Sequence, residues 1–544
     1  MNGRHSSPQK TLIFSGLLLL VLFLLSRVLQ WKAHALDGPF VSDAAAHLVS
    51  SLLVRDWLQH GLTENPLRFV IDYHAHLPMT GIGIWPPMYY AIGGVWFSLF
   101  GVATASAMAL SAMTVAALGG VAAALVARRA GWTLGCMVGL LLVANPLSER
   151  AADEFMLDIA SALACLLAAL SFARFVQKPS WANATWFGAI AAAALYVKYN
   201  VLGIALMPPL TIAIGRRWDL LKHPALYWAG AIVAILAGPW YLKTHGIVEQ
   251  GFRFSFGWTY ISLAVVENAK TIVDALTPMV SIFAMVGVVR TIHEGRALIA
   301  TDPLRVVCLG LAAAIYVFLL LVPVALQDRY LLPCIAPLAV LAAVEVRRLF
   351  DLLTQPAVRW GGIALLAVVT GYACWPTSQM PRTTVQEAAA AVRRDSPIVV
   401  LAVGDAVFEP AMLAAFAQSE TKRPSSWIVR GSRLFGGGGY NNADYLPKFN
   451  DPQDLLGEID RYGVQYVFYQ PIAHVHNEGG YGWIHVNQFG ELLGLAPDRF
   501  EEVLRTSEDP AIRVFRVKSS ERYTPDAAAL TELSGPKALM RMVR

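Results

Sequence analysis

Ionisable side chains stand at the edges of long apolar segments in this sequence, where they are rare. Asp43 follows the first apolar run, in SDAAAHLVSSLLVRDWL, and His47 lies one helical turn further on. Asp158 opens a later apolar segment, FMLDIASAL, and the preceding Asp153 or Glu154 could simply cap that helix. A charged group at membrane depth is costly, so its presence indicates a functional site. Asp43 and Asp158 are therefore candidate functional acids.

Two cations occupy similar positions between apolar segments. Lys198 lies in ALYVKYNVLG, and Arg329 lies in VALQDRYLLPCIAPLAV beside Asp328 and Tyr330. Lys198 could extend its ammonium group to the membrane surface, or it could bind an anionic ligand. The planar guanidinium of Arg329 suits a phosphate because it can donate to two oxygens at once. An acid, a lysine and an arginine at one surface indicate a site that combines a lipid phosphate with group transfer.

Several neighbouring polar residues have simpler explanations. Asp37 is typical of a loop or turn, and Glu149 and Arg150 could pair with each other. Five of the twelve histidines fall within residues 32–103, where a solvated interfacial loop would explain them: His34, His47, His60, His74 and His76. The spacing of His74 and His76 could alternatively serve a metal ion or a phosphate.

The composition indicates that these residues belong to an integral membrane protein. The chain has 544 residues, of which 56% are hydrophobic and 15% charged, whereas about a quarter of a soluble chain is charged. The net charge is +5, but lysines and arginines cluster between apolar runs, which is typical of topology signals rather than nucleic-acid binding. The five cysteines are far apart and lack the spacing of a zinc site or a disulfide framework.

About eleven apolar runs are suitable for membrane spans. If the N-terminus is inside, the connectors ARRAG, ARFVQK, GRRWDLLKH, VRTIHEGR and EVRRLFDLLTQPAVR all fall on the cytoplasmic side, as the positive-inside rule requires. The first run is expected to be an uncleaved span, because Arg27 and Lys32 lie where a signal-peptide cleavage site would be small and neutral. The runs cover about 12–30, 104–127, 132–149, 157–176, 181–197, 200–215, 224–241, 271–290, 304–325, 330–345 and 360–376.

The segment IWPPMYYAIGGVWFSLFG, residues 84–101, is predicted to be an amphipathic or partly re-entrant helix on the outer face. It is short and begins near Pro86 and Pro87, and counting it as a crossing would invert every later basic connector. The segment closes a first external loop of about residues 32–103. Within that loop, we expect a surface helix that carries Asp43 and His47 on one face.

The composition changes near residue 377. SPIVVLAV and VQYVFYQP are typical of buried strands, whereas EPAMLAAFAQS and DPQDLLGEIDRYG are typical of helices. This alternation predicts a small α/β domain on the outer side of the membrane. We therefore expect a membrane domain at 1–376 and a soluble domain at 377–544. The GGGGY stretch at 436–440 lacks the Lys-Ser/Thr of a phosphate-binding loop and is interpreted as a flexible loop.

The order of these segments resembles the GT-C superfamily of glycosyltransferases that use lipid-phosphate sugars. It is most similar to bacterial relatives of the protein O-mannosyltransferases and of the aminoarabinose transferases (glycosyltransferase family 39 and its neighbours). The resemblance is carried by SDAAAHLV, WPPMYYAIGGVWFSLFG, FMLDIASAL, YVKYNVLG and DRYLLPCIAPLAVLAA, which together cover most of the membrane region. The outer domain matches only in its placement.

The resemblance implies a GT-C fold and an inverting transfer of a hexose or pentose from a polyprenyl-phosphate donor. The acceptor would be a glycan, lipid or protein hydroxyl on the periplasmic face of a bacterial inner membrane, with the N-terminus cytoplasmic and the soluble domain periplasmic. Asp43 takes the place of the general base, which removes the proton of the acceptor hydroxyl. Lys198 and Arg329 are candidates to stabilise the leaving phosphate. Asp158, Tyr330 and His47 are further candidates for substrate binding.

The chain departs from the family pattern in two places. The second acid that usually follows the first is absent from Asp43-Ala44-Ala45-Ala46-His47. Ile84 and Trp85 stand where the aminoarabinose enzymes carry an acid and a lysine. These departures argue against a metal site and against lipid A as the acceptor, and no cofactor is implied.

A transporter or flippase of lipid-linked or anionic solutes is the main alternative, because it also needs charges near membrane depth. The absence of a detectable repeat between the two halves, and the large outer domain, favour the transferase. A non-catalytic scaffold or sensor would give no reason for clustered external acids and cations.

Overall fold

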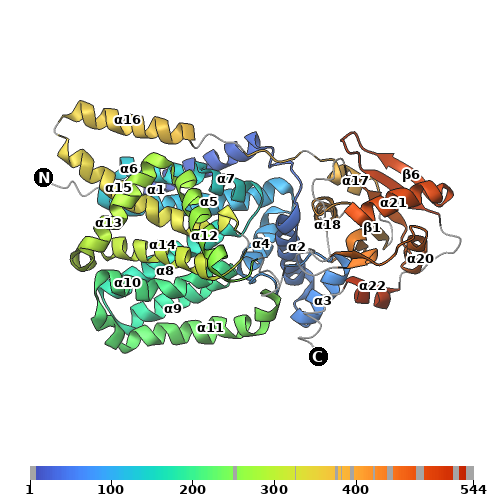
Figure 1. The fold of residues 1–544 in the computed structure, drawn as a ribbon, viewed down its shortest axis with the longest axis horizontal. Helices are drawn as coiled ribbons and strands as arrows, with labels where there is room; N and C mark the ends of the chain where they lie inside the picture. The colour runs from blue at the N-terminus through green and yellow to red at the C-terminus, as the bar shows by residue number, and fades with distance from the viewer. Residues whose placement is uncertain are drawn as a thin grey trace.

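Helices dominate one end of the molecule and a mixed α/β region forms the other, with α2 (Ser42–Asp56) and α3 (Pro66–His76) lying between them (Figure 1). The arrangement confirms the predicted polytopic helical fold with a C-terminal α/β region. The computed structural model describes residues 8–81, 83–248, 254–324, 326–353, 355–373, 378–381, 383–392, 397–420, 423–437, 445–472, 483–518 and 526–534. The predicted boundary at 376/377 and most of the GGGGY stretch lie outside the described residues.

The helical end contains six helices that are individually long and apolar enough to cross a membrane, or up to eight if each of two bent pairs is one span, among the described residues. The predicted number of about eleven is higher because it includes shorter helices. The helical elements of this end, whether or not they are long enough to span, are α1 (Pro8–Lys32), α5 (Thr104–Ala130), α6 (Trp132–Ala144), α7 (Pro146–Asp153), α8 (Asp158–Gln177), α9 (Trp181–Leu195), η2 (Tyr199–Leu206), α10 (Met207–Gly215), η3 (Trp218–Lys222), α11 (Pro224–Val248), α12 (Trp258–Leu276), α13 (Pro278–Thr301), α14 (Pro303–Leu321), α15 (Leu332–Leu352) and α16 (Pro356–Ala373).

Two of the predicted spans are broken. The run predicted at 271–290 is not one helix, because α12 and α13 meet at Thr277 with a bend of 113°. Thr277 has a φ of 70°, and Pro278 starts the new helix because it lacks the N–H that would continue the old one. Likewise α6 and α7 bend by 51° at Asn145, just before Pro146. Apolar composition continues across both breaks, so hydropathy alone does not reveal them.

The first external loop folds around α2. The predicted helix over 84–101 is α4 (Met88–Phe100), which has 13 residues and is too short to cross a bilayer on its own. It packs closely on α2, because a Cβ atom on Gly93 would lie 2.5 Å from the Ser51 Oγ. Most residues of α2 are buried, since α4 and α18 (Phe408–Ser419) cover it. That cover by α18 was not predicted.

The α/β region is built on a five-stranded sheet in the order β2-β1-β5-β7-β6. Strands β1, β2 and β5 are parallel, and β7 and β6 add an antiparallel edge. The predicted strands are confirmed as β1 and β5, and the predicted helices as α18 and α20. The elements are α17 (Val385–Ala390), β1 (Val399–Val403), β2 (Trp427–Arg430), α19 (Gly431–Leu434), β3 (Gly436–Gly437), β4 (Leu446–Pro447), α20 (Asp454–Arg461), β5 (Tyr466–Tyr469), α21 (Trp483–Leu495), η6 (Pro497–Arg499), β6 (Phe500–Arg505), β7 (Arg513–Val517) and α22 (Ala527–Ser534).

Candidate active site

Four charged side chains from distant parts of the chain meet beside the start of α2. The Nη2 atom of Arg329 donates to the Asp43 Oδ2 at 2.8 Å, across a separation of 286 residues. The Lys198 ammonium lies 2.5 Å from the Asp158 Oδ1, and the Arg329 Nε lies 3.7 Å from the Asp158 Oδ2. The structure therefore brings both predicted acids and both predicted cations into one cluster.

The two remaining predicted residues border this cluster. The Lys198 Nζ lies 4.7 Å from the centre of the Tyr330 ring. The His47 Nδ1 lies 3.0 Å from the hydroxyl of Tyr90, in α4. Burial lowers the pKa of His47 well below its usual value, and the charges of Lys198 and Arg329 lower it further. His47 is therefore a neutral neighbour of the two cations.

Each charged residue is placed at the end of a helix. Asp43 lies in the first turn of α2, where the helix dipole favours a carboxylate. Asp158 begins α8, and Arg329 lies in η5 (Asp328–Leu331), the short helix that leads into α15. Lys198 directly precedes η2. Apolar helices thus supply the scaffold, while their polar ends supply the site.

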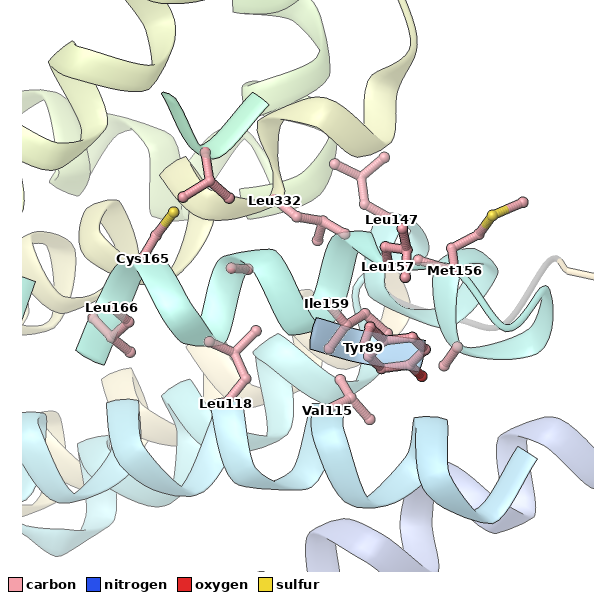
Figure 2. Packing of buried hydrophobic residues seen from close by; sticks show 14 of the residues in the cluster. Tyr89, Val115, Leu118, Leu147, Met156, Leu157, Ile159, Cys165, Leu166 and Leu332 are labelled. Carbon is pink, nitrogen blue, oxygen red and sulfur yellow. The ribbon is translucent and has the colours of Figure 1, made fainter. Parts of the chain in front are cut away.

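An aromatic cluster fixes the turn that carries Asp158. Phe155 is fully buried and has a φ of 56°, a conformation that non-glycine residues adopt only when the surroundings hold it. Its ring contacts Phe40, Tyr89 and Phe97, with ring centres between 5.6 and 6.1 Å apart. Figure 2 shows the same region from close by, with Tyr89 of α4 among the apolar residues of α5 and α8.

Exposure differs between the two acids in a way that bears on chemistry. The Asp158 side chain is 0% exposed and the Lys198 side chain is 8% exposed, so this pair lies inside the protein. The Asp43 side chain is 33% exposed and that of Arg329 is 18% exposed. Asp43 is consequently the acid of the cluster that a substrate can reach, whereas Asp158 orients the two cations.

A cavity of about 300 Å³ opens beside Arg329. Its walls come from α7, the turn after it, and the segment that leads into η5. Basic, acidic, amide and apolar side chains line it: Leu147, Arg150, Ala151, Glu154, Leu326, Gln327, Asp328 and Arg329. Such a volume lies at the lower end of the usual range for small-molecule sites, about 300–1,000 Å³.

Not every charged residue near the cluster was identified by the sequence analysis. Glu154 was interpreted only as a possible helix cap, yet its Oε2 lies 3.9 Å from the Arg329 Nη1. Its spacing of four residues from Asp158 gave the only signal, and the break between α7 and α8 obscured it. The suggested pairing of Glu149 with Arg150 is wrong, because Arg150 lines the cavity and makes no ion pair with any described residue.

The other sequence candidates lie apart from the cluster. Asp37 is exposed in a bend, as predicted for a loop residue. The His74 Nδ1 lies 2.5 Å from the Thr80 Oγ1, and the His76 ring stacks near Trp427 of β2 with ring centres 3.8 Å apart. His76 therefore joins the external loop to the sheet. Within the described ranges, no group of three or more His, Cys, Asp or Glu side chains is arranged to hold a metal ion.

Comparisons with known proteins agree with this architecture. Residues 85–242 match the family model described as dolichyl-phosphate-mannose-protein mannosyltransferase. The crystal structure of ArnT from Cupriavidus metallidurans bound to undecaprenyl phosphate is similar, with a TM-score of 0.54 and 15% identity over 95% of this chain and 99% of that one. The archaeal oligosaccharyltransferase AglB from Archaeoglobus fulgidus, in complex with an inhibitory peptide and a dolichol-phosphate, has a TM-score of 0.51 and 11% identity over 95% of this chain and 75% of that one. No curated protein sequence matches the chain.

These similarities confirm the resemblance to the GT-C superfamily. Sequence identity of 15% or less shows the fold alone. The chain therefore has the fold of GT-C glycosyltransferases, and its activity has to be argued from the site.

Proposed function

We propose that this protein transfers a sugar from a polyprenyl-phosphate donor to an acceptor hydroxyl, with inversion at the anomeric carbon. Asp43 acts as the general base, and Arg329 with Lys198 stabilises the departing phosphate. Reaction at the periplasmic face of a bacterial inner membrane follows from the positive-inside pattern of the connectors, which leaves Asp43 on the outer side.

The contact between Asp43 and Arg329 carries this proposal. An inverting transfer needs a base for the nucleophile and a cation for the leaving group, on opposite sides of one carbon. Here a partly exposed carboxylate and a guanidinium that lines a cavity lie 2.8 Å apart, and a donor that binds between them would separate the two groups and place its anomeric carbon between them. The family model and the lipid-phosphate ligands of the two similar structures support a polyprenyl-phosphate donor.

The ion pair also suggests the order of events. Arg329 donates a hydrogen bond to the Asp43 carboxylate and so occupies one of the oxygens that would accept a proton. A donor phosphate competes for the same guanidinium, because phosphate oxygens match its paired donors. Arg329 then turns to the phosphate and leaves Asp43 free to accept a proton. The base becomes available only when the donor is bound.

The bond changes are those of a single displacement. Asp43 accepts the proton of the acceptor hydroxyl as its oxygen bonds to the anomeric carbon, on the face opposite the phosphate. The bond between that carbon and the phosphate oxygen breaks, and its electron pair stays on the phosphate. Lys198 and Arg329 offset the negative charge that develops there. No protonation of the leaving group is needed, because phosphate is a stable anion.

A panel of labelled donors tests the proposal. Purified protein in sealed proteoliposomes would be incubated with polyprenyl-phosphate hexoses and pentoses and with a cell-envelope fraction as the source of acceptor. We expect the label to move from the donor to an acceptor, with the anomeric configuration inverted in the product. Movement of intact labelled lipid across the bilayer without transfer would instead support a flippase.

A further inference from the structure

Two polar side chains that line the cavity beside Arg329, those of Arg150 and Gln327, have no part in the proposed transfer reaction. Arg150, in α7, is exposed and makes no ion pair or hydrogen bond with the described residues through its side chain. The Oε1 atom of Gln327 is buried and has no hydrogen-bond partner among them either. A buried acceptor without a hydrogen bond loses its interaction with water without compensation, so a bound ligand that donates to it would be favoured.

The position of Arg150 is unusual as well as unpaired. The connector pattern puts this end of α7 on the outer side, where arginines are infrequent. Arg150 makes no ion pair with a described acid, although its positive charge acts on the nearby Glu154. Its guanidinium therefore lies at the cavity wall without an ion-pair partner among the described residues, in a lining that also contains Glu154 and Asp328.

The chemistry of the lining suits a sugar ring. Arginine supplies up to five donors in a plane, glutamine supplies both donors and an acceptor, and carboxylates supply acceptors. Hydroxyl groups of a sugar both donate and accept, so they satisfy all of these side chains. Leu147, Ala151 and Leu326 give the cavity apolar surface against which the C–H groups of a ring can pack. A simple phosphate would leave the acids Glu154 and Asp328 facing an anion.

We propose that this cavity binds a sugar ring, and that Arg150 and Gln327 are the residues that select it through its hydroxyl groups. The inference rests on the proposed function, because it places the ring beside the phosphate-binding Arg329 and the base Asp43. The ring is either the sugar of the donor or the terminal sugar of a glycan acceptor. Both have the same hydrogen-bonding chemistry.

Binding measurements separate the sugar from the lipid phosphate. The full-length protein in nanodiscs would be titrated with bare undecaprenyl phosphate and with undecaprenyl-phosphate hexose. For Arg150→Gln and Gln327→Leu, we expect at least a tenfold loss of affinity for the sugar-bearing lipid if the ring comes from the donor. Affinity for undecaprenyl phosphate should stay within twofold of wild type. Arg68→Gln is the matched control, since Arg68 is an exposed arginine in α3 outside the cavity.

A second measurement identifies an acceptor ring. At saturating donor, a tenfold rise in KM for a glycan acceptor, with donor affinity unchanged, would assign the cavity to the acceptor. Unchanged donor affinity and unchanged acceptor KM in both variants would overturn the inference. A wild-type protein that binds no polyprenyl phosphate would contradict the proposed function instead. In that case saturation-transfer NMR with methyl hexosides still tests the cavity, because contacts that are equal in wild type and Arg150→Gln would refute it.

Discussion

Each cation of the candidate active site is paired with an acid of the protein. Lys198 forms an ion pair with the fully buried Asp158, whereas Arg329 forms ion pairs with Asp43, Asp158 and Glu154. Asp158 thus has a different role from Asp43: it fixes two positive charges inside the protein. A buried ion pair of this kind is costly to break on one side only, because the remaining charge has no compensation.

Loss of Lys198 alone should therefore destabilise the protein. We expect Lys198→Met to lower the free energy of unfolding by about 3 kcal/mol, since Asp158 would keep a buried charge with only Arg329 nearby. The double variant Asp158→Asn, Lys198→Met should regain most of that stability but no transferase activity. Thermal unfolding in detergent, followed with an activity assay, measures both. Equal stability of the single and double variants would contradict a structural role for the pair.

At the scale of elements, the ends of helices were predictable and their packing was not. The sequence identified Asp43, Asp158, Lys198 and Arg329 because charge beside apolar segments is costly wherever those segments pack. That Arg329 reaches Asp43 rather than another acid depends on how distant segments pack, which hydropathy does not encode.

The breaks in the helices were also not predicted from hydropathy. The bend at Thr277 was missed since the apolar run continues across it. The covering of α2 by α18 was missed because it joins regions more than 350 residues apart. The strands β1 and β5 were recognised, since short runs of β-branched and aromatic residues are typical of buried strands.

The contact between α2 and α4 should be sensitive to a single methyl group. A Cβ atom at Gly94 would lie 2.7 Å from the Val54 Cγ1 and 3.0 Å from the backbone nitrogen of Arg55. We expect Gly94→Ala to lower the free energy of unfolding by about 1–3 kcal/mol, because the two helices must separate. Activity should fall too, since α2 carries Asp43.

Gly230→Ala is the control for this prediction. Gly230 lies in α11, and a Cβ atom there would meet no heavy atom within 4 Å. An alanine in the middle of a helix should then stabilise by about 0.5–1 kcal/mol. Thermal unfolding compares the two variants. If both shift the midpoint in the same direction, the close approach of α2 and α4 does not limit stability.

At the scale of the whole molecule, the α/β region is attached to the external loop that forms one side of the site. Arg423 lies 2.6 Å from Asp72 and 2.8 Å from Glu64, on the loop side. The Nη2 atom of the buried Arg55 donates to the carbonyl oxygen of Glu420 at 3.4 Å. The α/β region thereby braces α2 and α3 from the side opposite the membrane helices (Figure 1).

Reversing one charge should loosen this attachment without unfolding either part. Arg423→Glu would place a third acid beside Glu64 and Asp72. The ions are partly exposed, so we expect a loss of no more than about 1 kcal/mol of global stability. Hydrogen–deuterium exchange in α3 should nevertheless rise several-fold. Arg461→Glu, at an exposed pair within α20, should leave that exchange unchanged. Equal exchange in both variants would show that Arg423 does not hold the two regions together.

The most direct test of the account compares the transfer rate of Asp43→Asn with that of wild type, at saturating donor in a single turnover. A general base contributes typically about 10²–10⁴-fold. We predict that the variant loses at least a hundredfold in rate. It should still bind undecaprenyl phosphate at least as tightly as wild type, because Arg329 no longer has to leave a carboxylate. A transfer rate within threefold of wild type would contradict the assignment of Asp43 as the base.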